Sequence, residues 1–169
     1  MKNKYILLFC LLLFIVDRLI KYFAFYLPDE GIFYFSQVGF KLHLNQGLAF
    51  SLPLGQFLII IISSLITITL ISFWLKFYKS RTFLQDAEQN SVYSGKVRDK
   101  VKNFILINPL TLIIIGALSN LLDRIKFGAV IDLIDIWLWP AFNLSDCYII
   151  IGVIWLIWLI HKGLPKNAG

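Results

Sequence analysis

Four long apolar runs constrain the fold of this chain more than any other feature. They cover about residues 5–26, 56–78, 104–122 and 144–161. Each is close to the roughly 20 residues that a helix needs to cross the hydrocarbon layer of a bilayer. Hydrophobic residues make up 59% of the 169 residues, against roughly 45–50% in soluble domains. We therefore predict an all-α integral membrane protein with four transmembrane helices, forming one domain over residues 1–169.

Two of these runs contain charged residues, so hydropathy alone does not establish them. The first includes Asp17, Arg18 and Lys21, and the fourth includes Asp146. We still expect helices there, because a backbone that crosses a bilayer must satisfy its own hydrogen bonds. The start of the chain also resembles a signal peptide, but no small-residue cleavage site follows it. We expect an uncleaved first span.

The distribution of positive charge predicts the orientation in the membrane. Lysine and arginine gather before the first run, between the second and third, and after the fourth. The other two connecting segments contain only Lys41, Arg124 and Lys126. Because positive residues of short loops stay in the cytoplasm, both termini and segment 79–103 are predicted to be cytoplasmic. The net charge of +6 thus indicates topology and contact with membrane lipids, and no nucleic-acid partner is expected.

The connecting segments differ in character. In residues 28–55, apolar and polar residues partly alternate between glycines, which favours short β-strands on the outer membrane face, between the first two helices. Residues 79–103 are polar and are expected to form a solvated loop, partly helical or disordered. Cys10 and Cys147 have no metal-binding spacing and are expected to be buried free thiols.

Seven of the ten acidic residues fall at the predicted outer ends of spans or in outer segments. Ionisable groups near hydrocarbon are costly, and they are usually paired or functional. Three other acidic residues lie in segment 79–103, where solvation explains them. The seven are Asp17, Asp29, Glu30, Asp123, Asp132, Asp135 and Asp146.

Two short segments place polar side chains on shared helix faces. In NLLDR, Asn120, Asp123 and Arg124 stand at i, i+3 and i+4, and we expect Asp123 to pair with Arg124. In NLSD, Asn143 and Asp146 repeat the i, i+3 offset. Asn143 is also a good N-cap for a helix whose first turn contains Asp146.

Two carboxylates close together in a low-dielectric site share one proton, which is the chemistry of an aspartic peptidase. That chemistry needs two aspartates, a water molecule and orienting donors, without a metal. Once Asp123 is assigned to Arg124, the remaining candidates for the catalytic pair are Asp132, Asp135 and Asp146. Their spacing in the sequence does not select two of the three. A purely structural role, as polar pairs that lock a helix bundle, also remains open.

Five motifs, in order along the chain, resemble those of the prolipoprotein signal peptidases (signal peptidase II). They are DRLIK at 17–21, LNQGLAFSL at 44–52, GALSNLLDR at 116–124, VID at 130–132 and PAFNLSD at 140–146. This resemblance implies an intramembrane aspartic endopeptidase of the bacterial cytoplasmic membrane, with its site at the outer face. It would remove the signal peptide from diacylglyceryl-modified prolipoproteins by cleaving before the lipidated cysteine, without a cofactor, as a monomer.

The resemblance also implies roles for individual residues. Asp132 and Asp146 would be the catalytic pair. Asn45, Asn120, Arg124 and Asn143 would bind the substrate backbone or orient the pair. The supporting residues would be Asp17, Lys21, Gly47, Phe50 and Asp123, without a metal ligand among them.

The chain departs from the family pattern at several positions away from this pair. Ile115 and Ser119 stand where glycine is common, and Gln46 and the Leu144-Ser145 pair also differ. Asp135 is the competitor of Asp132 and would be its neighbour on a helix; motif position favours Asp132. A carrier with a carboxylate ion path is the main rival, but it predicts carboxylates spread through the membrane depth. His43 and His161 do not form a zinc-protease motif.

Overall fold

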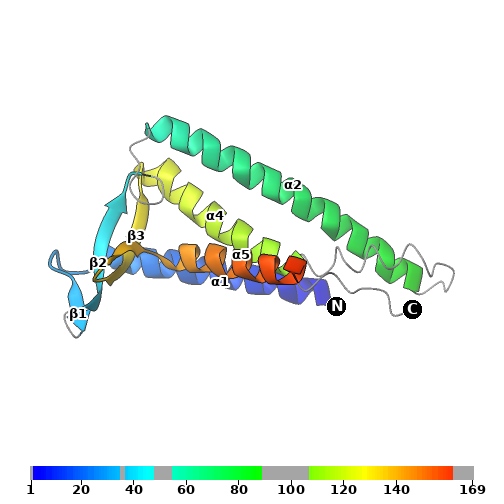
Figure 1. Ribbon diagram of the computed structural model, residues 1–169, viewed down its shortest axis with the longest axis horizontal. Helices are drawn as coiled ribbons and strands as arrows, with labels where there is room; N and C mark the ends of the chain where they lie inside the picture. The colour runs from blue at the N-terminus through cyan, green and yellow to red at the C-terminus, as the bar shows by residue number, and fades with distance from the viewer. Residues whose placement is uncertain (1, 35–36, 48–54, 89–106, 162–169) are drawn as a thin grey trace.

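In the computed structural model, long helices extend from a small sheet at one end (Figure 1). The structure describes residues 2–34, 37–47, 55–88 and 107–161. The helices are α1 (Lys2–Ala24), α2 (Gln56–Glu88), α4 (Ile107–Phe127) and α5 (Leu144–His161). The strands are β1 (Ile32–Tyr34), β2 (Val38–Asn45), β3 (Val130–Ile136) and β4 (Trp139–Phe142). Each predicted apolar run coincides with one of these helices.

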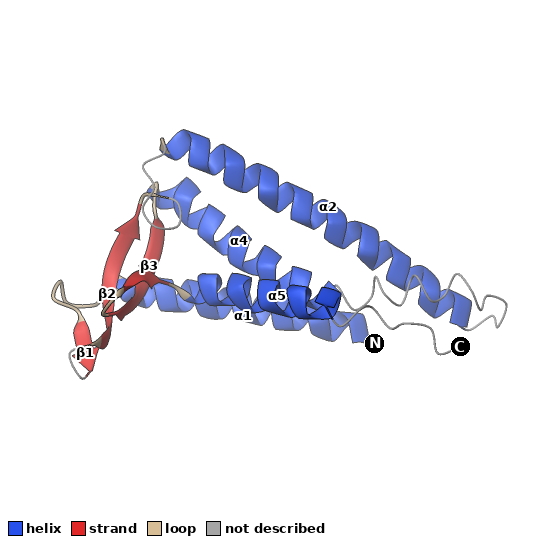
Figure 2. Cartoon of the chain, in the orientation of Figure 1, coloured by secondary structure: helices blue, strands red, loops and turns tan. Residues whose placement is uncertain are grey.

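The helix α4 is central to the bundle, because it packs against α1, α2 and α5. The sheet lies where α1 and α4 end and where α2 and α5 begin (Figure 2). Lys2 and His161, the outermost described residues, therefore lie at the opposite end of the bundle (Figure 1). The helix α2 continues to Glu88, past the predicted boundary at 78 and into the segment expected to be a partly helical or disordered loop. The rest of that segment lies outside the described residues.

All pairings in the sheet are antiparallel, in the order β1-β2-β3-β4. The β-structure predicted within residues 28–55 is confirmed as β1 and β2. The sheet is larger than this prediction covers, because β3 and β4 come from the connection between α4 and α5. Residues at the start of β3 are buried in succession, so the strand lacks the alternation that marks a half-exposed strand.

The turn from α4 into β3 depends on Gly128. Its φ of 68° lies in the left-handed region, which glycine adopts without a steric penalty. The Gly128 N–H donates to the carbonyl oxygen of Arg124 at 3.0 Å and closes the helix end. The chain then enters β3. There Val130 pairs with Asn45 of β2, and Asp132 pairs with His43 of β2.

Burial in this protein is inverted relative to a soluble domain. Asp17, Lys21, Asp123 and Asn143 are buried, while large apolar side chains on the helix surfaces are exposed, as Phe57 is at 78%. Such an arrangement suits a surface that faces lipid. Among the described residues, two helical segments are long and apolar enough to span a bilayer, Gln56–Lys76 and Leu144–His161. Crossings by α1 and α4 stay predictions, as does the single-domain organisation.

Glycines allow α4 and α5 to approach closely, which gives a testable consequence. A Cβ atom at Gly152 would lie 2.7 Å from Ile113 Cγ1 and 2.8 Å from the carbonyl oxygen of Pro109. We expect Gly152→Ala to lower the free energy of unfolding by about 1–3 kcal/mol, because the two backbones must separate. Unfolding in detergent micelles measures this.

The matched control is Gly55→Ala, since a Cβ at Gly55 meets nothing within 4 Å. We expect this control to change the stability by less than about 1 kcal/mol. Equal losses in the two variants would show that the close approach of α4 and α5 is not what Gly152 provides.

Candidate active site

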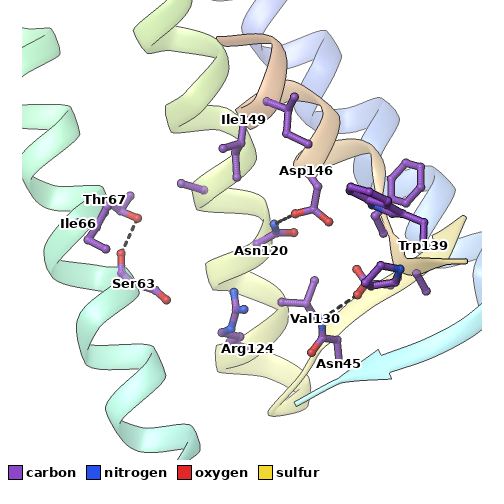
Figure 3. A pocket seen from close by; sticks show the side chains of 16 residues that line it. Asn45, Ser63, Ile66, Thr67, Asn120, Arg124, Val130, Trp139, Asp146 and Ile149 are labelled. Atoms are coloured by element: carbon purple, nitrogen blue, oxygen red, sulfur yellow. Dashed lines mark hydrogen bonds between the residues drawn. The ribbon is translucent and has the colours of Figure 1, made fainter. Parts of the chain in front are cut away.

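One cavity, of about 490 Å³, opens between the sheet and helices α2, α4 and α5. Asp132 from β3 and Asp146 from the first turn of α5 both contribute to its wall. Three more polar side chains, Asn45, Asn120 and Arg124, also line it (Figure 3). The remaining wall is mostly apolar, and includes Ile66, Trp139, Phe142, Ile149 and Ile150. An apolar cavity with a few converging polar groups is the usual form of a ligand site.

Both carboxylate oxygens of Asp132 accept hydrogen bonds from asparagine side chains. Asn45 Nδ2 donates to Oδ2 at 3.0 Å, and Asn143 Nδ2 donates to Oδ1 at 2.7 Å. The Gly47 N–H donates to Asn45 Oδ1 at 3.0 Å, so the NH₂ group of Asn45 is turned toward Asp132. Asp132 is 2% exposed and is held in one orientation from two sides.

Asp146 is positioned by the start of α5. The Asp146 N–H donates to Asn143 Oδ1 at 3.0 Å, and the Asn143 N–H donates to Asp146 Oδ2 at 3.2 Å. This reciprocal pair is a capping box, and it confirms the predicted N-cap role of Asn143. The other oxygen, Oδ1, accepts a hydrogen bond of 2.8 Å from Asn120 Nδ2 (Figure 3). The cap thus holds Asp146 against α4.

Burial makes Asp132 difficult to ionise. The pKa of Asp132 is raised from 3.8 to about 6, chiefly because its carboxylate is removed from water. The charge of Asp146 also raises this pKa, while the hydrogen bonds from Asn45 and Asn143 and the charge of Lys21 lower it. Asp132 therefore retains a proton in weakly acidic solution, where an ordinary aspartate is ionised.

The expected pairing of Asp123 with Arg124 is wrong. Asp123 is fully buried and accepts hydrogen bonds from two residues of α1: Arg18 Nη1 at 2.6 Å and Lys21 Nζ at 2.7 Å. Consecutive helical residues point about 100° apart, so Asp123 faces α1 while Arg124 lines the cavity. Arg124 Nη2 instead donates to the carbonyl oxygen of Gly47 at 3.4 Å.

A charged cluster of Asp17, Arg18, Lys21 and Asp123 joins α1 to α4 beside the cavity. Arg18 Nη2 donates to Asp17 Oδ2 at 2.7 Å, and Lys21 Nζ lies 3.3 Å from the same oxygen. The Ser119 hydroxyl also donates to Asp17 Oδ2. Sequence reasoning included Asp17, Lys21 and Asp123 but missed Arg18 as a member and treated Ser119 only as a departure from a motif.

Asp135 and Asp132 lie on the same strand but have different surroundings. The two residues are three apart on β3, so the expectation of a helical neighbour is wrong. Asp135 Oδ2 lies 2.9 Å from His43 Nε2 and does not line the cavity. Phe50, the remaining predicted supporting residue, lies outside the described residues.

The fold is that of bacterial membrane enzymes. Two such enzymes, solved by the in meso method, have similar structures. One, at 2.3 Å resolution, has a TM-score of 0.73 and 23% identity over 98% of this chain and 93% of its own. The other, at 1.9 Å resolution, has a TM-score of 0.69 and 25% identity over 95% and 94%.

Sequence comparison identifies the family. The family model described as signal peptidase (SPase) II matches residues 9–162. The lipoprotein signal peptidase of Thermodesulfovibrio yellowstonii is 31% identical over 163 residues, 92% of this chain and 91% of that protein. This chain therefore belongs to the signal peptidase II family. The alignments with the lipoprotein signal peptidases of Syntrophus aciditrophicus, at 41% identity, and Polynucleobacter necessarius, at 48%, span under half of those relatives, 47% and 42% of their lengths.

Proposed function

We propose that this protein is an intramembrane aspartic endopeptidase that removes the signal peptide from diacylglyceryl-modified prolipoproteins, cleaving before the lipidated cysteine. One observation carries the proposal. Asp132 and Asp146 reach the same cavity from a strand and a helix, and the asparagine pair Asn120 and Asn143 links their carboxylates. Membership of the signal peptidase II family supports the substrate class.

The two carboxylates divide the chemistry between them. Asp132 holds the shared proton, because its pKa is raised to about 6, and it donates this proton to the oxygen of the scissile carbonyl. Asp146 takes a proton from a water molecule as the water oxygen bonds to the carbonyl carbon. When the resulting tetrahedral intermediate collapses, the C–N bond breaks, the leaving nitrogen accepts the proton from Asp146, and one hydroxyl of the intermediate returns its proton to Asp132 as the acid forms. The products are the signal peptide acid and the new amino terminus at cysteine.

The other polar residues of the cavity serve substrate binding and orientation. Asn120 and Asn143 orient the pair through the hydrogen bonds described above. Arg124 and Asn45 line the wall near the end of β2, where they donate to carbonyl oxygens of the substrate backbone. Ile66 of α2 and Ile149 of α5 provide apolar surface for the signal helix, which enters sideways from the bilayer.

The proposal includes the membrane arrangement. All four helices cross the bacterial cytoplasmic membrane, both termini are cytoplasmic, and the catalytic pair lies at the outer face, in a monomer with one domain. The described residues nearest the termini lie at the end of the bundle away from the sheet (Figure 1). Lysine and arginine are concentrated on that side in the sequence, which supports this orientation.

Cleavage of a synthetic prolipoprotein peptide tests the function. The purified protein should cut a peptide with a diacylglyceryl cysteine, and mass spectrometry should locate the cut immediately before that cysteine. The same peptide with an unmodified cysteine should be cut at least tenfold more slowly. Absence of cleavage of the lipidated peptide by folded protein would refute the proposed function.

Asn45 gives a prediction for pH dependence. A hydrogen bond donated to a carboxylate favours its ionised form, so Asn45→Ala should raise the pKa of Asp132 above about 6. The alkaline limb of the kcat/KM profile, where the shared proton is lost, should therefore move to higher pH by roughly one unit, because a charge-assisted bond contributes about 1.5 kcal/mol. A profile measured across pH 4–9 checks this, and a shift to lower pH would contradict it.

A further inference from the structure

We infer that Lys21 is a positioning residue: it fixes the side-chain amide of Asn120 in the orientation that presents its NH₂ group to Asp146. This inference rests on the proposed function for its catalytic consequence. Lys21 is 1% exposed, and its Nζ lies 2.9 Å from Asn120 Oδ1. The same ammonium donates to Asp123 Oδ2 at 2.7 Å and to Ser145 Oγ at 3.4 Å. An ammonium donates and never accepts, so each of these contacts, like the 3.3 Å ion pair with Asp17 Oδ2, needs an acceptor atom on the partner.

The donor-only character of lysine determines which end of the Asn120 amide faces it. Because the ammonium needs an acceptor, the oxygen of Asn120 must point to Lys21, and the NH₂ group must point to Asp146, where the distance is 2.8 Å. The reversed amide would place NH₂ against the ammonium and oxygen against the carboxylate. Both contacts would then be repulsive.

The same amide connects the second carboxylate. Asn143 Nδ2 donates to Asn120 Oδ1 at 3.2 Å and to Asp132 Oδ1 at 2.7 Å. The oxygen atom of Asn143 is already committed to the N–H of Asp146 at the helix cap. Reversal of Asn120 would therefore remove a donor from Asp146 and an acceptor from Asn143 at once. Lys21 acts on both carboxylates through one side chain.

Arg18 provides the matched control. Arg18 and Lys21 both pair with Asp17 and Asp123, so removal of either cation perturbs the charged cluster. Of these two side chains, only Lys21 donates to Asn120 within the part of the chain that the structure describes. A merely structural role predicts similar behaviour for Lys21→Met and Arg18→Met, whereas a positioning role separates them.

A double-mutant cycle on kcat tests the inference. We expect Lys21→Met to lower kcat about 10–100-fold, the range for residues that orient reacting groups through another residue, with KM changed less than about threefold. Arg18→Met should change kcat less than about threefold. In an Asn120→Ala background, Lys21→Met should lower kcat no further, because its target is gone. An equal loss with and without Asn120 would overturn the inference.

Two additional measurements keep the test decisive. The variant Lys21→Gln retains a hydrogen-bond donor without the charge, so it should recover at least part of the kcat lost in Lys21→Met. If Lys21→Met does not fold, Lys21→Gln is compared with Asn120→Ala instead. A kcat of Lys21→Gln as low as that of Asn120→Ala would then overturn the inference. The side-chain NH₂ protons of Asn120, followed by NMR, should exchange faster with water in Lys21→Met than in Arg18→Met. Exchange needs no substrate, so it tests the positioning role even if the lipidated peptide is not cleaved and the proposed function fails.

Discussion

Asp146→Asn is expected to lower kcat on the lipidated peptide about a thousandfold, because an amide accepts no proton from water and general acid–base catalysis contributes about 10²–10⁴-fold. Asparagine keeps the size of the side chain and an oxygen that accepts the Asn143 N–H of the helix cap. KM should therefore change little, and thermal unfolding should stay close to that of the parent protein. A time course of cleavage at saturating substrate measures the effect.

The double variant Asp132→Asn/Asp146→Asn provides the control for a shared mechanism. Groups that act as one unit give strongly non-additive losses, so the double variant should be about as inactive as either single variant. A double variant a further thousandfold slower than each single variant would show that the two carboxylates act independently. That result would contradict one shared proton between them.

Asp123→Ala should have the largest effect on stability. Its carboxylate is fully buried and accepts hydrogen bonds from Lys21 and Arg18. Removing one partner leaves buried positive charge uncompensated, which costs about 3–5 kcal/mol in comparable buried pairs. The midpoint of unfolding in detergent should fall accordingly, and the yield of folded protein from membranes with it.

Asp135→Ala is the matched control for Asp123→Ala. Asp135 also pairs with a basic side chain, His43, but its side chain is 26% exposed. Exposed pairs contribute about 0–1 kcal/mol, so this variant should remain near the parent stability. If Asp135→Ala destabilised the protein as much as Asp123→Ala, the burial of Asp123 would not be the cause of its effect on stability.

The helices could be predicted from the sequence because each apolar run is long and a helix forms its backbone hydrogen bonds within its own segment. The start of α5 was also accessible, since Asn143 and Asp146 have the spacing of a cap. Half of the sheet, the strands β3 and β4, could not be predicted from the sequence. Residues Val130 to Leu133 are all buried, so β3 shows no alternation and resembles the apolar runs beside it.

Pairings between distant residues were beyond sequence reasoning. Asp123 and Arg124 are adjacent, which made their pairing attractive, but the helix turns them toward different neighbours. The partners of Asp123 are 105 and 102 residues away, in α1. Spacing likewise left Asp132 and Asp135 as alternatives, because the choice depends on which of the two side chains lines the cavity. Motif position favoured Asp132, and in the structure Asp132 lines the cavity while Asp135 does not.

The most direct measurement is cleavage of the diacylglyceryl peptide by Asp132→Asn beside Asp135→Asn, at equal amounts of folded protein. The two variants make the same chemical change three residues apart on β3, where Asp132 lines the cavity and Asp135 does not. The proposed pair predicts that Asp132→Asn loses about a thousandfold in kcat, while Asp135→Asn stays within about threefold of the parent protein. Loss of cleavage in Asp135→Asn, with Asp132→Asn active, would contradict the assignment of Asp132 and Asp146 as the catalytic pair.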